Sequence, residues 1–329
     1  MIEMKVLDYS DVRMILKMNN AIELVEKAFR EKGLGRVQMP AKTYLFFDKY
    51  NGDLRTMPAY FQHLDIAGVK IVNSHPDNPA KHGLPTVMAI VVLVDPKTGR
   101  PLCLMDGTLI TGVRTGAAVA VATKYLARKS SKTIGVVGAG SMAPYSIEGL
   151  HHVLRIDSIK IFDISRNRAE RLAREVELNY GISASAVERC SDAVKDVDVL
   201  VTLTPSREPI IKDEWIFEGV HINAMGADAP GKEELDPVIL KRAKIVVDDL
   251  EQAIHSGEVN VPISRGILHP NEIYGELGEV VAGIKPGRVS DSEITIFDST
   301  GLAIQDVITA WHVYEEAERK GIGRKIVLH

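Results

Sequence analysis

The residue types that could carry chemistry gather first at a glycine-rich turn. The segment of residues 138–143 reads GAGSMA; it follows the apolar run 133–137 and precedes a helical pattern. Gly138 permits a tight turn, Gly140 lets the backbone approach a pyrophosphate, and the small Ala143 lets the helix pack closely on the strand. Free N–H groups at the helix start attract an anion. The turn predicts phosphate binding, although glycine-rich turns also occur as plain strand-to-helix connections.

An acidic residue stands where this motif places a ribose contact. A second apolar run ends at Asp163, beyond the glycine turn. A carboxylate there binds a ribose 2′-hydroxyl and repels a 2′-phosphate, so NAD is expected rather than NADP. Arg166 and Arg168 follow directly and could bind a phosphate if the loop turned inward. Exposed arginines at a helix start are the simpler interpretation.

Four cations in the first part of the chain form a second group of candidates: Lys42, Arg55, Lys70 and Arg114. Lys70 lies inside the apolar run Ala67-Gly68-Val69-Lys70-Ile71-Val72, where burying a charge is costly unless an anion or a function keeps it there. A buried lysine has a lowered pKa and exchanges protons near neutral pH. The pattern alone equally allows Lys70 to face water on an edge strand.

Asp228 is a third candidate, because it closes the segment Gly226-Ala227-Asp228 that follows the predicted strand 220–225. Ligands of parallel α/β sheets bind at the carboxyl ends of the strands, where a carboxylate could orient water or an amine and accept a proton. A turn or helix-cap aspartate is the alternative. The histidines lack metal-site spacing, and Cys103 and Cys190 support neither a disulfide framework nor a cysteine metal site. We expect no metal.

Composition excludes several classes of protein. The chain has 329 residues with 45% hydrophobic and 26% charged residues, an ordinary globular composition that allows two domain cores. A net charge of −4 and the lack of a basic run argue against nucleic-acid binding. The acidic N-terminal segment does not resemble a secretory signal, and no apolar run is long enough to cross a bilayer. We expect a cytoplasmic protein with small-molecule partners and no membrane contact.

The periodicity of apolar residues predicts the elements that position these candidates. Two short helices are expected between residues 10 and 33, with a turn near Asn19 and Asn20. A mostly antiparallel sheet is expected from the β-rich runs 42–47, 68–73, 86–94 and 101–105. An alanine-rich helix follows over 108–129. From residue 132 onward, strands at 133–140, 158–163, 197–205, 219–226, 243–249 and 293–298 alternate with helical segments, and a last helix spans 302–320.

This alternation predicts an α/β protein in two domains. Residues 129–302 are expected to form a Rossmann-type domain, a doubly wound parallel sheet that binds a dinucleotide. Residues 1–128 together with 303–329 are expected to form a smaller, discontinuous α+β domain built on the antiparallel sheet. The last helix would then return to the first domain.

Six segments together resemble the ornithine cyclodeaminase/mu-crystallin family, most closely its archaeal alanine dehydrogenase branch. They are GVKIVNSHP at 68–76, GLPTV at 83–87, RTGAA at 114–118, VGAG at 137–140, HINAMGAD at 221–228 and FDSTG at 297–301. The resemblance runs nearly end to end and is far more specific than the glycine turn alone. It implies an NAD-dependent oxidoreductase that acts on an amino or keto acid, and a homodimer formed through the sheet of the first, substrate-binding domain.

The resemblance also implies a role for individual residues. Lys70 matches the family's active-site lysine and Asp228 its active-site acid. Lys42 would hold the substrate carboxylate, while Arg114 would contact either that carboxylate or the coenzyme phosphates. The remaining predicted coenzyme contacts are Thr86, Gly138, Gly140, Ser141, Met142, Asp163, Ile164, Ser165, Gly226, Ala227, Asp228 and Ser299.

One departure from the family pattern favours a particular activity. Arg55 stands where the cyclodeaminases carry an acid that receives the distal ammonium of ornithine. A cation there repels a diamino acid and suits a short carboxylate, so we expect reversible oxidative deamination of L-alanine to pyruvate and ammonium. Ornithine cyclodeamination and reduction of cyclic ketimines remain alternatives within the family. A mu-crystallin-like protein that binds a dinucleotide or small ligand without turnover is the non-enzymatic alternative.

Overall fold

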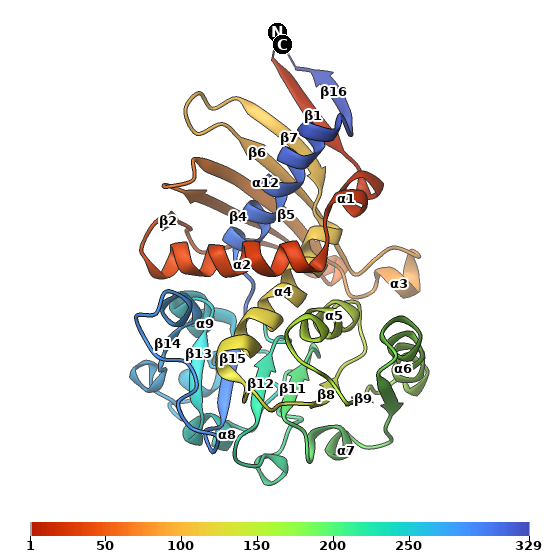
Figure 1. The fold of residues 1–329 in the computed structure, drawn as a ribbon, viewed down its shortest axis with the longest axis vertical. Helices are drawn as coiled ribbons and strands as arrows, with labels where there is room; N and C mark the ends of the chain where they lie inside the picture. The colour runs from red at the N-terminus through yellow and green to blue at the C-terminus, as the bar shows by residue number, and fades with distance from the viewer. Residues whose placement is uncertain (1, 329) are drawn as a thin grey trace. The chain divides into compact units, whose positions relative to one another are not determined.

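The chain forms two compact units in a computed structural model that describes residues 2–328 (Figure 1). The first unit comprises Met1–Arg114 and Leu302–His329, and the second comprises Thr115–Gly301. The sequence pattern predicted the domain boundaries after residues 128 and 302 instead. The difference lies in helix α4 (Thr108–Leu126), a single uninterrupted helix whose residues belong to both units. The α/β fold class with one parallel and one mainly antiparallel sheet is confirmed.

The first unit is built on an eight-stranded sheet in the order β16-β1-β7-β6-β5-β4-β2, with β3 also paired to β4. Neighbouring strands run antiparallel except for the parallel pair β1 and β7. The strands are β1 (Glu3–Leu7), β2 (Val37–Gln38), β3 (Thr43–Phe47), β4 (Gly52–Phe61), β5 (Ile66–Ser74), β6 (Val87–Val94), β7 (Pro101–Asp106) and β16 (Arg324–Val327).

Helix α12 (Ala303–Lys320) packs on the centre of this sheet, against β4, β5 and β6, and α2 (Met18–Gly33) packs on α12 (Figure 1). The side of the sheet that faces α12 is buried, since alternate residues of β4 and β5 are buried. The N-terminal half of α12 is buried all round, which is typical of a core helix. The other helices of this unit are α1 (Tyr9–Ile15), η1 (Asp48–Tyr50) and α3 (Asn78–Lys81).

Several sequence predictions for the first unit were incomplete or wrong. The turn between the first two helices lies at Leu16 and Lys17, because Asn19 and Asn20 belong to the first turn of α2. Strand β4 was missed although it is the longest strand of the sheet, since Pro58 interrupts its pattern. The outer strands β1 and β16 were also missed.

The second unit contains an all-parallel, eight-stranded sheet in the order β10-β9-β8-β11-β12-β15-β13-β14. The chain winds outward from β8 and then crosses back to β11, which is the doubly wound arrangement predicted from sequence. The strands are β8 (Thr133–Val137), β9 (Ser158–Phe162), β10 (Ser183–Ala186), β11 (Val199–Thr202), β12 (His221–Ala224), β13 (Lys244–Val247), β14 (Gly275–Glu276) and β15 (Thr295–Asp298). The short strands β10 and β14 escaped prediction.

Apolar clusters cover both faces of this sheet. Val199 and Val201 of β11 point into one cluster, while the intervening Leu200 points into the other. Strands buried on both faces are expected where helices cover a parallel sheet from each side. The helices of this unit are α5 (Ala143–Val153), α6 (Arg166–Tyr180), α7 (Cys190–Val194), η2 (Asp213–Trp215), α8 (Pro237–Arg242), α9 (Leu250–Ser256), α10 (Asn260–Ser264), η3 (Pro270–Glu272) and α11 (Leu277–Val281).

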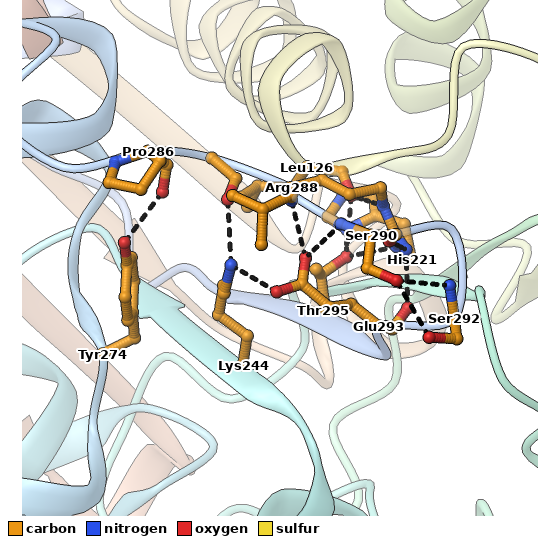
Figure 2. A network of polar contacts seen from close by, with 12 residues as sticks. Leu126, His221, Lys244, Tyr274, Pro286, Arg288, Ser290, Ser292, Glu293 and Thr295 are labelled. Atoms are coloured by element: carbon orange, nitrogen blue, oxygen red, sulfur yellow. Dashed lines mark hydrogen bonds and ion pairs between the residues drawn. The ribbon is translucent and has the colours of Figure 1, made fainter.

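Arg288 anchors the loop that leads into β15 (Figure 2). Its guanidinium donates to the carbonyl of Leu126 at 2.6 Å, that of Glu293 at 2.6 Å and that of Val220 at 3.2 Å. It also donates to the Thr295 hydroxyl at 2.9 Å, which in turn contacts Nδ1 of the buried His221 at 3.0 Å. The network therefore ties the end of α4 to the amino ends of β12 and β15.

Replacing Arg288 with Met should destabilise the protein by about 2–4 kcal/mol, because several carbonyl groups lose their donor. Urea unfolding of the variant measures this loss. Arg319→Met is the matched control: Arg319 is exposed and its guanidinium donates to the carboxylate of Glu316, so the change in stability should be clearly smaller. Equal stability of the two variants would show that the network contributes nothing.

Within residues 2–328, no helix combines the length and the apolar character needed to cross a membrane.

Candidate active site

The glycine turn lies between β8 and α5, as the motif predicted. Gly138 has a φ of +103°, a conformation that side chains disfavour, and its N–H donates to the Phe162 carbonyl at 2.8 Å. A Cβ on Gly138 would lie 3.0 Å from the backbone of Leu203, whereas a Cβ on Gly140 would meet no atom within 4 Å. Gly138 is therefore needed for the turn itself, and Gly140 borders open space that a ligand can enter.

A cavity of about 630 Å³ opens beside this turn. It lies at the carboxyl ends of β8, β9 and β11, where the direction of winding changes and where ligands of such sheets bind. Its lining is mostly apolar, as expected for a small-molecule site. The lining residues are Val137, Gly138, Gly140, Phe162, Asp163, Ile164, Arg168, Cys190, Leu203, Thr204, Pro205, Ser206, Pro209, Ile210 and Lys212.

Asp163 is the acid at this cavity, and its side chain is only 7% exposed. Oδ2 accepts the Ala139 N–H at 2.8 Å, and Oδ1 accepts the Ser165 N–H at 2.7 Å. Arg168 donates to Oδ1 at 2.9 Å. The carboxylate is thus held in place by the glycine turn on one side and by the start of α6 on the other. The ion pair with Arg168 was not foreseen.

Lys70 lies in the middle of β5 and is 1% exposed. Since β5 pairs with β4 on one side and β6 on the other, the edge-strand alternative is wrong. Its Nζ forms an ion pair with Asp306 Oδ2 of α12 at 2.7 Å. Burial and the nearby charge of Arg114 lower the pKa of Lys70 to about 7, although Asp306 opposes the shift. A side chain that ordinarily stays charged can therefore exchange a proton near neutral pH.

Arg114 shares the same carboxylate. Its Nε donates to Asp306 Oδ1 at 3.0 Å and its Nη1 donates to Gln305 Oε1 at 2.9 Å. We call Lys70, Arg114, Gln305 and Asp306 the Lys70 cluster; each is less than a tenth exposed. With Lys70 protonated, these side chains carry two positive charges and one negative charge. Loss of the Lys70 proton balances the cluster, which agrees with the direction of the pKa shift.

Arg55 and Lys42 also belong to the first unit. Arg55 opposes Val72, and Met57 opposes Lys70, so Arg55 and Lys70 lie on the same face of adjacent strands. The guanidinium of Arg55 donates to both oxygens of Asp53 at 2.9 Å and lies 5.3 Å from the Tyr44 ring centre. Lys42 is close enough for its charge to lower the pKa of Lys70. The structure therefore brings the four predicted cations into one unit.

Asp228 lies in the loop after β12, and its side chain is 36% exposed. Lys232 donates to Asp228 Oδ1 at 2.6 Å. Among the helices of residues 2–328, none begins at Asp228, which removes the helix-cap alternative and leaves a loop carboxylate at the carboxyl end of a parallel strand. Its salt bridge to Lys232 was not predicted.

The other predicted coenzyme residues are divided between the units. Ile164 lines the cavity and is 92% exposed, whereas Ser141, Met142 and Ser165 flank the cavity residues in sequence. The Ser299 hydroxyl donates to the buried Asp248 at 3.3 Å. Thr86 belongs to the first unit. Gly226 and Ala227 lie in the loop of Asp228.

Sequence reasoning missed Asp306 and Gln305, the partners of Lys70 and Arg114. A signal was present: Gln305 and Asp306 interrupt the mainly apolar segment 302–310, as Lys70 interrupts its own strand. A polar pair within a core helix is a candidate for pairing with buried cations elsewhere. The part of the chain that the structure describes contains no grouping of metal-ligating side chains, and both cysteines are free.

The fold and the cavity define an α/β protein whose second unit has a dinucleotide-type site and whose first unit carries a buried lysine. The model of the ornithine cyclodeaminase/mu-crystallin family matches residues 2–321, and the chain belongs to this family. The resemblance drawn from the motifs is thus confirmed.

Individual relatives extend this finding. An alanine dehydrogenase of Archaeoglobus fulgidus is 52% identical over 98% of both chains. A solved archaeal alanine dehydrogenase dimer with bound NAD superimposes with a TM-score of 0.95 at 51% identity, covering 100% of both chains. A Thermococcus litoralis Delta(1)-pyrroline-2-carboxylate reductase, solved with NADH and L-proline, gives a TM-score of 0.95 at 41% identity and covers 98% of this chain and 100% of its own.

Proposed function

We propose that this protein is an NAD-dependent alanine dehydrogenase, which converts L-alanine and water to pyruvate and ammonium and runs in both directions. The observation that carries the proposal is the buried amine of Lys70, whose pKa of about 7 suits proton exchange during amine oxidation. The similarity to the two archaeal alanine dehydrogenases described above, at 52% and 51% identity, also supports the proposal.

The second unit would hold the coenzyme. Gly138 forms the tight turn and Gly140 leaves room for the pyrophosphate beside the start of α5, while Asp163 would bind the ribose hydroxyls. The open space at Gly140 and the mostly apolar cavity of about 630 Å³ fit a dinucleotide. When bound, NAD supplies the acceptor for the hydride that leaves Cα of the amino acid.

The cations of the first unit would hold the substrate. Lys42 and Arg55, with Arg114 as a further candidate, would orient the carboxylate and so fix the position of Cα. Arg55 offers only donors, and Asp53 already occupies one edge of its guanidinium. The distal ammonium of ornithine would therefore find no acceptor on Arg55, which favours the small side chain of alanine over a diamino acid.

Two residues would handle protons and water in the reaction. The neutral amine of Lys70 would accept a proton from the substrate ammonium and return it in the reverse direction. Asp228 would stabilise the cationic imine of the substrate and orient the water that attacks it. Lys232, its ion-pair partner, would help to hold the carboxylate of Asp228 in place.

We also propose that the protein is a homodimer, as the solved archaeal relative is. Leu45, Phe46 and Tyr50 expose 57%, 61% and 64% of their surface on or beside β3. Large apolar side chains gathered on a sheet are typical of an interface between protein chains. Size-exclusion chromatography with light scattering would measure the molar mass of the protein in solution. A monomer at micromolar concentration would contradict this proposal.

A substrate panel tests the proposed activity. The purified protein is incubated with L-alanine, L-ornithine, pyruvate plus ammonium, or a cyclic imine, each with NAD(H) and with NADP(H). We expect equal amounts of NADH and pyruvate from L-alanine. Proline formed from ornithine without net NADH would identify a cyclodeaminase. Efficient reduction of Delta(1)-pyrroline-2-carboxylate without alanine oxidation would favour the reductase activity of the Thermococcus relative.

Replacing Asp163 with Ser should change the coenzyme preference. The substitution removes the charge that repels a 2′-phosphate and releases Arg168 from its ion pair. We expect the ratio of kcat/KM for NAD to that for NADP to fall at least about 100-fold, roughly 2.7 kcal/mol. The double variant Asp163→Ser with Arg168→Ala is the control, since it should lose much of the gain for NADP. An unchanged ratio would show that Asp163 does not face the ribose.

A further inference from the structure

Three buried carboxylates of the second unit have no part in the proposed chemistry. Glu234, Glu258 and Asp298 are each 0% exposed and come from separate segments of the chain. Burying a charge is costly unless hydrogen bonds compensate. Here Asp298 accepts backbone N–H groups from the segment of Glu258, and Glu258 accepts them from the segment of Glu234, so the three are linked in a series.

Glu234 ends this series beside the cavity. Oε1 accepts the N–H of Thr204 at 2.7 Å and its hydroxyl at 2.7 Å, while Oε2 accepts the Thr202 hydroxyl at 2.7 Å and the Gly226 N–H at 3.1 Å. Thr204 lines the cavity, and Gly226 opens the loop that carries Asp228. One side chain thus joins the loop after β11 to the loop after β12.

We propose that Glu234 is a positioning residue for the coenzyme: as a buried carboxylate it holds the loops after β11 and β12 in the conformation that binds the dinucleotide. This inference rests on the proposed use of NAD. It assigns to Glu234 no contact with the coenzyme or the substrate.

Gly226 shows how closely this carboxylate is fitted to the loop. A Cβ on Gly226 would lie 2.5 Å from Glu234 Oε2 and closer still to the carbonyl oxygen of Thr204. Real side chains do not approach to that distance, so glycine is required for the N–H of residue 226 to reach Glu234. The loop and the carboxylate are therefore mutually adjusted.

Glu258 links Glu234 to Asp298. Its Oε1 accepts the N–H groups of Glu234 at 2.8 Å and Leu235 at 2.6 Å, and Asp298 accepts the N–H groups of Glu258 at 3.0 Å and Val259 at 3.2 Å. Oε2 of Glu258 is buried and has no hydrogen-bond partner among residues 2–328. Burial and the charge of Glu234 raise the pKa of Glu258 well above its ordinary value, whereas four hydrogen bonds oppose the rise for Glu234. The pKa of Glu258 is therefore raised more strongly than that of Glu234, whose hydrogen bonds favour the carboxylate form.

Two isosteric substitutions test this assignment, with the dissociation constant of NADH measured by fluorescence titration at neutral pH. Glu234→Gln places an amide where the Gly226 N–H needs an acceptor, so NADH should bind about tenfold more weakly. Glu258→Gln keeps an oxygen that can accept the N–H groups of Glu234 and Leu235, and it removes no contact to the loops after β11 and β12, so NADH affinity should stay within about twofold of the wild type. Equal affinity of Glu234→Gln and the wild type, or an equal loss in both variants, would overturn the proposal.

A milder pair of variants decides the matter if Glu234→Gln does not fold. Thr202→Val removes one hydrogen bond to Glu234 from a buried position outside the cavity lining. Thr123→Val is the control, because the equally buried Thr123 bonds to Asn223 instead. Both should lower the melting temperature similarly, yet only Thr202→Val should weaken NADH binding, by about threefold. Identical NADH affinity in the two variants would reject the positioning role.

The wild-type titration separates the two proposals. If the wild type binds NADH but the variants do not differ as stated, this inference fails while the proposed function stands. If the wild type does not bind NADH at any accessible concentration, both fail.

Discussion

Replacing Lys70 with Ala should lower kcat/KM for L-alanine about 10³-fold, because the reaction loses the group that exchanges the substrate proton. The affinity for NADH should remain within about twofold, since the cavity beside the glycine turn belongs to the other unit. The truncation also leaves space in the buried site. Methylamine added to the variant should therefore restore part of the rate, as a soluble amine takes the place of the lost side chain.

Lys5 provides a matched control for this experiment. Like Lys70, it is a buried lysine of the first unit, with 6% of its surface exposed. It donates to the carbonyls of Ala317 and Ile322 and pairs with Glu318, near the end of α12. Lys5→Met should therefore lower stability and leave kcat/KM unchanged. Full activity of Lys70→Ala, or identical losses in the two variants, would contradict a proton-exchanging role for Lys70.

Replacing Asp306 with Asn should have the second large effect, on both pH dependence and stability. Asp306 raises the pKa of Lys70 through its charge and its contact with Nζ. Without that charge the pKa of Lys70 falls below about 7, so the acidic limb of the pH profile of kcat/KM should move to lower pH. Arg114 and Lys70 also lose their shared counter-charge, and breaking such a buried pair costs about 3–5 kcal/mol.

The sign of the pH effect on stability follows from the lowered pKa. Lys70 binds its proton more weakly in the folded than in the unfolded protein, so its contribution to stability rises as pH increases from about 7 to the ordinary lysine range. In Asp306→Asn this rise should begin at lower pH. Thr309→Val is the control, because Thr309 lies one turn further along α12 and bonds only to a backbone carbonyl. An unmoved limb in Asp306→Asn would show that the carboxylate does not act on Lys70.

Patterns within short stretches of sequence predicted the glycine turn, the position of Asp163 and the doubly wound sheet. The glycine turn and Asp163 lie in one strand–helix–strand unit, and their spacing sufficed to place both at the same cavity. The alternation of strands and helices likewise predicted the doubly wound sheet. Strand β4 was not predicted because proline is rare in central strands and Pro58 lies within it. The first turn was misplaced because consecutive asparagines are typical of turns, whereas here they belong to the first turn of α2.

The charge partners could not be predicted in the same way. Lys70 and Asp306 come from opposite ends of the chain and meet only because α12 packs on β5. The apolar surroundings of Lys70 indicated that it needs an anion, but they did not say which one. The pairing of Arg55 with Asp53 shows the reverse case. Asp53 and Arg55 are two residues apart on one strand, so their side chains lie on the same side of it. This alternation of side chains along a strand could have revealed the ion pair from the sequence.

The pH dependence of NADH formation from L-alanine tests the central claim most directly. The wild-type protein is assayed between about pH 5 and about pH 9, with pyruvate measured alongside. If Lys70 accepts the substrate proton, kcat/KM rises with pH through an apparent pKa of about 7, and one pyruvate accompanies each NADH. A rate that does not change across neutral pH, or no NADH from L-alanine at any pH, would contradict the account.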